Sequence, residues 1–215
     1  MGAAVAQPAQ KTVLTFQPTW GTQPVEINHW YHLNTTDSVE VENFKCYISS
    51  IQLYQANTMM WKEVNSYHLL NIAHPSTFHI LLDVPADVAY NSIRFNLGID
   101  SATNVAGVLG GDLDPTHGMY WTWQSGYINL KLEGKSNLCA TRWNEFSFHL
   151  GGYHAPYNAL QTVQVTITQQ MVHTMYIDLA AFFSAVQLTR HQQLMSPGAE
   201  AVQFSQLFST VFKLP

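Results

Sequence analysis

Hydrophobic and polar residues alternate along most of this chain. Successive side chains of a strand point to opposite faces, so a repeat of two predicts strands with one buried face. β-branched and aromatic residues are enriched in the same segments, as is typical of strands. The pattern predicts eight strands, at residues 12–16, 39–54, 67–72, 78–84, 92–99, 128–132, 145–150 and 160–168. Turn-rich segments separate them, which favours the antiparallel connections of a β-sandwich.

The C-terminal part of the chain has a different repeat. Beyond Pro197, apolar residues recur at the spacing of one helix face, at Phe204, Leu207, Phe208, Val211 and Phe212. Ser196 and Pro197 are the expected N-cap and first helical position. A shorter helix is expected at residues 179–185. The predicted fold is therefore mostly β, an antiparallel β-sandwich with a C-terminal helix and one short additional helix.

Composition is typical of one globular domain. The chain has 215 residues, of which 47% are hydrophobic and 11% charged, unlike the polar, highly charged profile of disordered chains. We expect residues 11–215 to form a single domain, and residues 1–10 to be a disordered or cloning-derived N-terminal stretch. A formal net charge of -5 disfavours nucleic acid as a partner. No apolar run approaches the length of about 18 residues expected of a membrane span.

Cys46 and Cys139 allow two interpretations. A disulfide between them would close a loop of about 93 residues and could stabilise the fold by roughly 4 to 5 kcal/mol on the chain-entropy model. Alternatively, one thiol packs in a strand and the other lies on a loop. An exported location would favour the bridge, and the sequence leaves both interpretations open.

The segment from Asp112 to Gly134 carries the most informative chemistry. It places His117, Met119, Trp121 and Trp123 close together after an Asp-Pro turn. Imidazole and thioether groups favour soft ions such as Cu(I) over Mg²⁺ or Ca²⁺. The acidic residues nearby do not follow the spacing of a Ca²⁺-binding loop, so we interpret Asp100, Asn104, Asp112 and Asp114 as turn-capping residues.

The same segment resembles a known family. The order Met119-x-Trp121-x-Trp123-x-Ser125-Gly126-Tyr127, followed by Lys131-x-Glu133-Gly134, is similar to the signature of the MbnP-like family. Four other segments fit this family, namely Tyr47-Ile-Ser-Ser-Ile-Gln-Leu53, Ser66-Tyr-His-Leu69, Ile93-Arg-Phe-Asn-Leu-Gly-Ile-Asp-Ser-Ala102 and Phe146-Ser-Phe-His-Leu-Gly-Gly152. The similarity runs from about Lys11 to the C-terminal segment.

This resemblance implies a periplasmic or secreted, copper-associated protein of the kind encoded in methanobactin operons. In some members, a partner dihaem protein related to cytochrome c peroxidases oxidises a tryptophan to kynurenine, and the product helps to bind copper. Trp121 and Trp123 are the candidates for such oxidation here. On a strand they would share a face, and the structural alternative is that both are buried in the core.

Histidines in the family-like segments are the leading candidate ligands. His68 and His149 lie in or near predicted strands, and His149 must project out of the core if Phe148 and Leu150 fill it. His191 precedes Met195 by four residues and adds an imidazole, while His117 and Met119 are further candidates. Each has a structural alternative, namely a hydrogen-bonded imidazole at the surface or a methionine in the core.

These observations favour a periplasmic or cell-surface protein that captures or buffers copper, as Cu(I) or Cu(II), at a mononuclear His-rich site. The phosphate-binding, nucleotide-binding and nucleophile motifs of common enzymes are missing, so we expect no catalytic residue and no enzyme activity. One alternative is an adhesion or interaction module with a Trp-rich surface and no metal function. An electron-transfer copper site is disfavoured, since no Cys lies close to a His and a Met.

Overall fold

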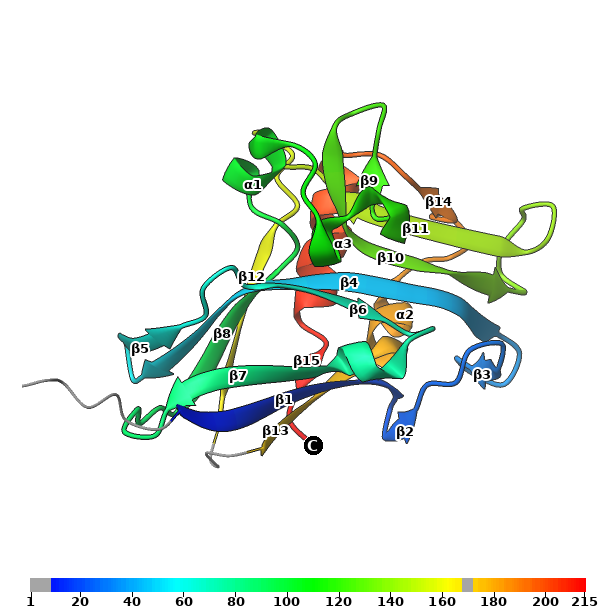
Figure 1. Ribbon diagram of the computed structural model, residues 1–215. Helices are drawn as coiled ribbons and strands as arrows, with labels where there is room; N and C mark the ends of the chain where they lie inside the picture. The colour runs from blue at the N-terminus through cyan, green and yellow to red at the C-terminus, as the bar shows by residue number, and fades with distance from the viewer. Residues whose placement is uncertain (1–8, 168–171) are drawn as a thin grey trace, which may run out of the picture.

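The computed structural model describes residues 9–167 and 172–215, which form two facing β-sheets (Figure 1). The smaller sheet has the strand order β15-β13-β1-β2. Strand β7 also pairs with β1, along residues 9–15, whereas β2 pairs with residues 19–20. Its strands are β1 (Ala9–Trp20), β2 (Gln23–Pro24), β7 (His79–Pro85), β13 (Val172–Asp178) and β15 (Phe212–Lys213). None of the helices within the described residues is long and apolar enough to cross a membrane.

The larger sheet is built around the long strand β4 (Ser38–Gln55). Its main path runs β12-β8-β4-β10-β11-β14, while β3, β5 and β6 also pair with β4 and β9 pairs with β10. The bounds are β3 (Trp30–His32), β5 (Thr58–Lys62), β6 (Tyr67–Asn71), β8 (Ser92–Leu97), β9 (Tyr120–Trp121), β10 (Gly126–Ser136), β11 (Glu145–Gly151), β12 (Gln161–Thr166) and β14 (Gln193–Leu194).

The main hydrophobic core fills the space between the sheets and the two C-terminal helices, α2 (Leu179–Ala185) and α3 (Ala199–Ser209). Aromatic rings join these layers. Phe16 of β1 meets Phe95 of β8 edge to face at 5.4 Å, and Phe148 of β11 meets Phe204 of α3 at 5.2 Å. Such contacts bury large apolar areas and dominate core energetics.

A second, smaller core lies on the outer face of the larger sheet. The loop between β8 and β10 covers this face and contains α1 (Ser101–Ala106) and the 3-10 turns η2 (Gly111–Leu113) and η3 (Pro115–His117). Another 3-10 turn, η1 (Pro75–Phe78), precedes β7. The buried residues of the outer core are Tyr47, Leu69, Ile99, Leu113, Met119, Trp121, Tyr127 and Ile128. In Figure 1 this loop lies above β4 and β10.

The mostly β fold predicted from the sequence is confirmed, and a strand occupies each of the eight predicted segments. The sandwich is not wholly antiparallel, because β1 pairs with β13 and β11 pairs with β14 in parallel. The pattern missed β13. This strand begins directly after residues 168–171, which lie outside the described part of the chain. It also missed β5 and the strands β2, β3, β9, β14 and β15, of which the last five have only two or three residues and are too brief to show a repeat.

Both predicted helices are present, and both ends of the C-terminal one are corrected. This helix begins at Ala199 with Gly198 as its N-cap, so Ser196 and Pro197 precede the cap and do not form it. It ends at Ser209, so Val211 and Phe212 lie beyond it, and Phe212 belongs to β15. Helix α1 was interpreted as a turn, because its six residues show no apolar repeat. Strand β1 begins at Ala9, two residues before the expected start of the domain, and residues 1–8 lie outside the described part.

Cys46 and Cys139 are both free and buried. Burial raises the pKa of the Cys139 thiol to about 11 and raises that of Cys46 further still. The structure therefore follows the second interpretation, in which one thiol packs in a strand and the other lies on a loop. Cys46 is in β4, and Cys139 is in the loop after β10. Neither thiol is suited to nucleophilic or redox chemistry, because both are held protonated.

Asp178 joins four segments at one end of the smaller sheet. Its carboxylate accepts hydrogen bonds from the backbone N–H of Gly21 at 3.1 Å and of Ala181 at 3.3 Å, and it pairs with Lys213 Nζ at 2.6 Å. Burial alone would raise the pKa of Asp178, but the hydrogen bonds from Lys213, Ala181 and Gly21 outweigh it and hold the pKa below its usual value.

We predict that Asp178→Ala lowers the free energy of unfolding by about 2–4 kcal/mol at pH 7, since it removes a helix cap and an ion pair. Because the folded-state pKa is depressed, this contribution is present above the usual aspartate pKa and is lost as the pH falls below it. Urea unfolding at pH 7 and pH 3 measures the difference. Asp83→Ala is the control, since Asp83 forms a solvent-exposed ion pair with Lys11. Equal losses in the two variants would contradict the prediction.

Candidate metal site

His149 lies on the outer face of β11. Phe146, Phe148 and Leu150 point into the main core, so the alternate residues Ser147, His149 and Gly151 face outward. The outward position predicted for His149 from this alternation is therefore confirmed. The residue is nevertheless only 7% exposed, because neighbouring strands and the loop between β8 and β10 surround it.

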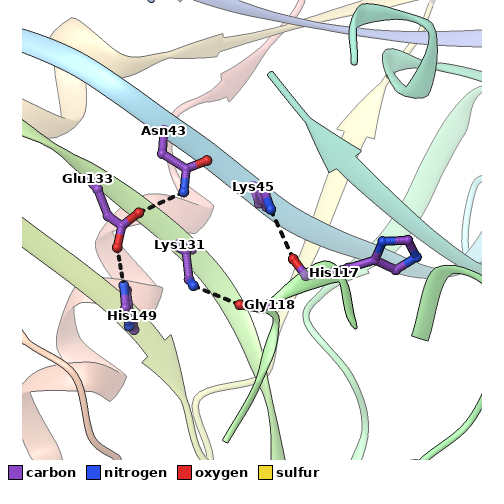
Figure 2. A network of polar contacts seen from close by, with 7 residues as sticks. All are labelled: Asn43, Lys45, His117, Gly118, Lys131, Glu133 and His149. Carbon is purple, nitrogen blue, oxygen red and sulfur yellow. Dashed lines mark hydrogen bonds and ion pairs between the residues drawn. The ribbon is translucent and has the colours of Figure 1, made fainter. Parts of the chain in front are cut away.

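A carboxylate holds the His149 ring. His149 Nε2 lies 2.7 Å from Glu133 Oε1, and Asn43 Nδ2 donates to Glu133 Oε2 at 2.7 Å (Figure 2). The hydrogen bond from His149 is the main cause that lowers the pKa of Glu133 to about 2. Burial opposes this shift, and the hydrogen bond from Asn43 adds to it. Glu133 is thus firmly anionic at neutral pH and oriented by groups on both neighbouring strands.

The Trp121 ring of β9 lies against β11, the strand that contains His149. A Cβ atom added to Gly151 would lie 2.7 Å from Trp121 Cζ3 and 2.8 Å from the Tyr127 carbonyl oxygen, so the indole covers the backbone of β11 at this glycine. Gly151 is two residues from His149 on the same face. The indole ring therefore covers the outer face of β11 two residues along the strand from His149.

The two candidate tryptophans have different environments. Trp121 is 6% exposed and Trp123 is 66% exposed, and their ring centroids are 5.8 Å apart. Strand β9 ends at Trp121, so Trp123 lies in the following turn, where the alternation of a strand does not apply. The alternative in which both rings are buried is wrong for Trp123. Met119 is fully buried in the outer core.

The segment that contains Met195 runs along the other edge of β11. Strands β11 and β14 pair in parallel, with Ser147 opposite Gln193 and Phe148 opposite Leu194. Met195 is the next residue after this pairing ends. The chain stays close beyond that point, since a Cβ atom at Gly152 would lie 3.0 Å from Pro197 Cβ. Met195 is about half exposed.

Two lysines fasten the loop to the sheet next to this site. Lys45 Nζ donates to the His117 carbonyl oxygen at 2.9 Å, and Lys131 Nζ donates to that of Gly118 at 2.7 Å. Lys131 is paired with Lys45 on one side and with His149 on the other. Burial is the main cause that lowers the pKa of Lys131. These contacts anchor the loop just before Met119 and Trp121.

The remaining candidate histidines lie elsewhere. His68 is opposite Ile48, a residue of the main core, and its Nε2 lies 2.8 Å from Glu63 Oε2, so it faces the space between the sheets. His191 packs against Phe204 of α3, with 5.5 Å between ring centroids. The His117 ring points away from His149, with its Nε2 3.1 Å from the Gly111 carbonyl oxygen (Figure 2).

The structure therefore does not bring His68, His149 and His191 together. Within residues 9–167 and 172–215, no group of three or more His, Cys, Asp or Glu side chains is placed to hold a metal ion. The expectation of one convergent three-histidine site is not met. His68 and His149 lie on opposite faces of the larger sheet, and His191 lies beside α3. What the structure places near His149 instead is the Trp121 ring, which lies against Gly151 of the same strand face.

Asp100 and Asp114 have the predicted turn-capping role, whereas Asp112 and Asn104 bind distant strand residues instead. Asp100 accepts from the Thr103 N–H at the start of α1, and Asp114 accepts from the Thr116 N–H at the start of η3. Asp112 accepts from the Leu69 N–H at 2.9 Å, and Asn104 accepts from the Tyr127 N–H at 2.8 Å. They secure the loop on the outer face.

Sequence reasoning missed Glu133, Gly151 and Lys131 as parts of the site. The signal was available in the motif Lys131-x-Glu133-Gly134, because alternate residues of a strand share a face. Gly134 has its own reason to be glycine, since a Cβ atom there would lie 1.9 Å from the Glu40 carbonyl oxygen. Strand register, which the motif alone does not provide, was needed to place Glu133 beside His149.

We predict that Gly151→Ala lowers the free energy of unfolding by about 1–3 kcal/mol, because the added methyl group would displace the Trp121 ring or the Tyr127 backbone. Thermal unfolding and tryptophan fluorescence would measure the loss and the movement of the indole. Gly110→Ala is the matched control, since nothing lies within 4 Å of a Cβ atom there. An alanine at position 151 with unchanged stability and fluorescence would show that the contact is loose.

Comparisons with known proteins inform on the family and the fold of this chain. A model of the MbnP family matches residues 9–196. The chain is also similar to a solved structure, "MbnP from Methylosinus trichosporium", with a TM-score of 0.63 and 13% sequence identity over 84% of this chain and 80% of that chain. At this identity the structural similarity shows the fold alone. No curated protein sequence matches significantly. Because the family model covers most of its length, the chain belongs to the MbnP family.

Proposed function

We propose that this protein binds copper on the outer face of its larger sheet, at a site that contains His149 and lies against Trp121. The observation that carries the proposal is the contact between the Trp121 ring and Gly151, two residues along β11 from His149. It brings a potential nitrogen ligand next to an oxidisable ring in a chain of the MbnP family.

The donor atoms around His149 suit a soft ion. The described residues form no hydrogen bond to His149 Nδ1. Met195 follows directly after β14, the strand that pairs with β11, and we propose its thioether as a further ligand. Imidazole and thioether groups favour Cu(I), whereas the hard cations Mg²⁺ and Ca²⁺ prefer oxygen ligands. Glu133, the nearest carboxylate, is already engaged by His149 and Asn43.

Oxidation of Trp121 would complete this donor set. An unmodified indole is a hydrogen-bond donor only, whereas kynurenine provides an aromatic amine and a ketone. Trp121 is the better candidate because it lies against β11, while Trp123 points into solvent. We propose that a dihaem partner related to cytochrome c peroxidases supplies the oxidising equivalents. The product would be about 4 Da heavier, through loss of one carbon and gain of one oxygen.

A binding role in an exported compartment follows from this proposal. The protein would capture or buffer copper, either periplasmic or at the cell surface, and would not turn over a substrate. The clamp formed by Lys45 and Lys131 would hold the Trp121 segment against the strand that carries His149. Binding and release of the ion would then depend on one small region of the sheet.

The alternative of an interaction module has one specific observation in its favour, which is the exposed Trp123 side chain. Tryptophan is enriched at interface hot spots. The two functions can be separated by experiment. A protein partner that binds equally well with a copper chelator present, and is lost in Trp123→Ala, would support the interaction module.

We predict that the protein takes up Cu(I) and that His149→Phe weakens this binding at least tenfold. Titration with a competing Cu(I) chelator under reducing conditions measures the affinity. Uptake should also be weaker at pH 5 than at pH 7.5, because a metal-bound imidazole must be unprotonated.

His191→Phe is the control, since His191 lies beside α3 and away from the proposed site. Equal copper affinity in wild type and His149→Phe would exclude this location for the site. The intact mass of the native protein tests the separate proposal that Trp121 is oxidised.

A further inference from the structure

The contacts of His149 determine which of its two ring nitrogens bears a proton. Nε2 lies 2.7 Å from Glu133 Oε1. A carboxylate has lone pairs and no hydrogen to donate, so the imidazole nitrogen must be the donor in this bond. In a neutral ring the proton then resides on Nε2, and the lone pair available to a cation resides on Nδ1.

Glu133 is itself held so that this bond is specific. Its other oxygen, Oε2, accepts from Asn43 Nδ2 at 2.7 Å, and Asn43 is opposite Glu133 in the pairing of β4 with β10. On the other side, β11 places Ser147 opposite Glu133 and His149 opposite Lys131. The carboxylate is therefore fixed between two strands, and the imidazole meets it in one orientation.

The other neutral tautomer of His149, with its proton on Nδ1, would lose the hydrogen bond to Glu133. His149 is only 7% exposed, so water has little access to an unpaired group at this position. A buried group left without its hydrogen-bond partner is costly, and more so when a charge is involved. The alternative tautomer, with its proton on Nδ1, would place two lone pairs against each other at Nε2 and Oε1.

We infer that Glu133 is a positioning residue that fixes His149 as the Nε2–H tautomer and makes Nδ1 the nitrogen that binds the metal. The assignment of Nδ1 as ligand rests on the proposed copper function, whereas the tautomer is a property of the metal-free protein. Metal-binding histidines commonly donate their second ring N–H to a carboxylate, which sets the ring orientation and strengthens the ligand.

The chain contains a matched control for this inference. His68 Nε2 lies 2.8 Å from Glu63 Oε2, so it forms the same kind of pair. His68 is opposite Ile48 of the main core, on the other face of the sheet from Trp121. Glu63→Gln thus disturbs a His–Glu pair without touching the proposed site.

The test is long-range ¹H–¹⁵N NMR on protein labelled with ¹⁵N-histidine, with the His149 signals identified by their loss in His149→Phe. In metal-free wild type we expect only the Nε2–H tautomer of His149 at neutral pH. Cu(I) is diamagnetic, so its addition should shift the Nδ1 signal of His149 most strongly. An Nδ1–H tautomer before copper, or a coordination shift confined to Nε2 after it, would overturn the inference.

Variants extend the test to affinity. Glu133→Gln offers both an acceptor and a donor to the ring, so we expect mixed tautomers of His149 and a loss of about 10-fold to 100-fold in Cu(I) affinity. Glu63→Gln should alter the His68 signals and leave both the His149 tautomer and the affinity unchanged. Equal losses in the two variants would overturn the positioning role. If Glu133→Gln does not fold, the wild-type spectra, assigned with His149→Phe, still test both the tautomer and the nitrogen that binds Cu(I).

Failure of the two proposals can be told apart. If metal-free His149 is the Nε2–H tautomer, shifted to mixed tautomers in Glu133→Gln, but Cu(I) leaves its signals unchanged, the copper site is wrong and Nδ1 is not a ligand, while the action of Glu133 on the ring stands. If Cu(I) binds through His149 but the metal-free ring is the Nδ1–H tautomer, the copper site stands and the role of Glu133 is overturned.

Discussion

The contact between the Trp121 indole and the backbone of β11 at Gly151 determines the geometry of the candidate site. Only a residue without a side chain leaves room for the ring, because a Cβ atom there would lie within 3 Å of both the indole and a backbone carbonyl. The indole in turn belongs to the outer core, which holds the whole β8–β10 loop against the sheet. The geometry of the candidate site and the packing of the outer core therefore depend on the same aromatic contact.

A polar strip borders this outer core, and its order along the sheet has a physical reason. The inner face of β4, β10 and β11 is apolar, so charged groups on these strands can lie only on the outer face. There Lys131 satisfies a loop carbonyl, while Glu133 binds His149 and Asn43. Each charge is paired or hydrogen-bonded, as buried charges must be. The strip thus anchors a loop and orients an imidazole with the same few side chains.

The sequence predicted well those features that depend on neighbours along the chain. Alternation placed Phe148 and Leu150 inside and His149 outside, and Asp100 and Asp114 cap turns as expected. It failed where distant segments decide the outcome. The parallel pairing of β13 with β1 and of β14 with β11 leaves no local signal. Trp123 became exposed because a turn follows Trp121, which interrupts the repeat that would have buried both rings.

The histidines show why motif membership alone does not locate a site. His68 and His149 both lie in family-like segments, and each is paired with a glutamate at nearly the same distance. Their surroundings differ because β6 and β11 lie on opposite sides of β4, and the pairing of His68 with Ile48 turns its ring toward the space between the sheets. His149 faces the outer core and the Trp121 segment. A His–Glu pair is therefore not sufficient for a site, and the face of the sheet on which the pair lies decides which other groups can join it.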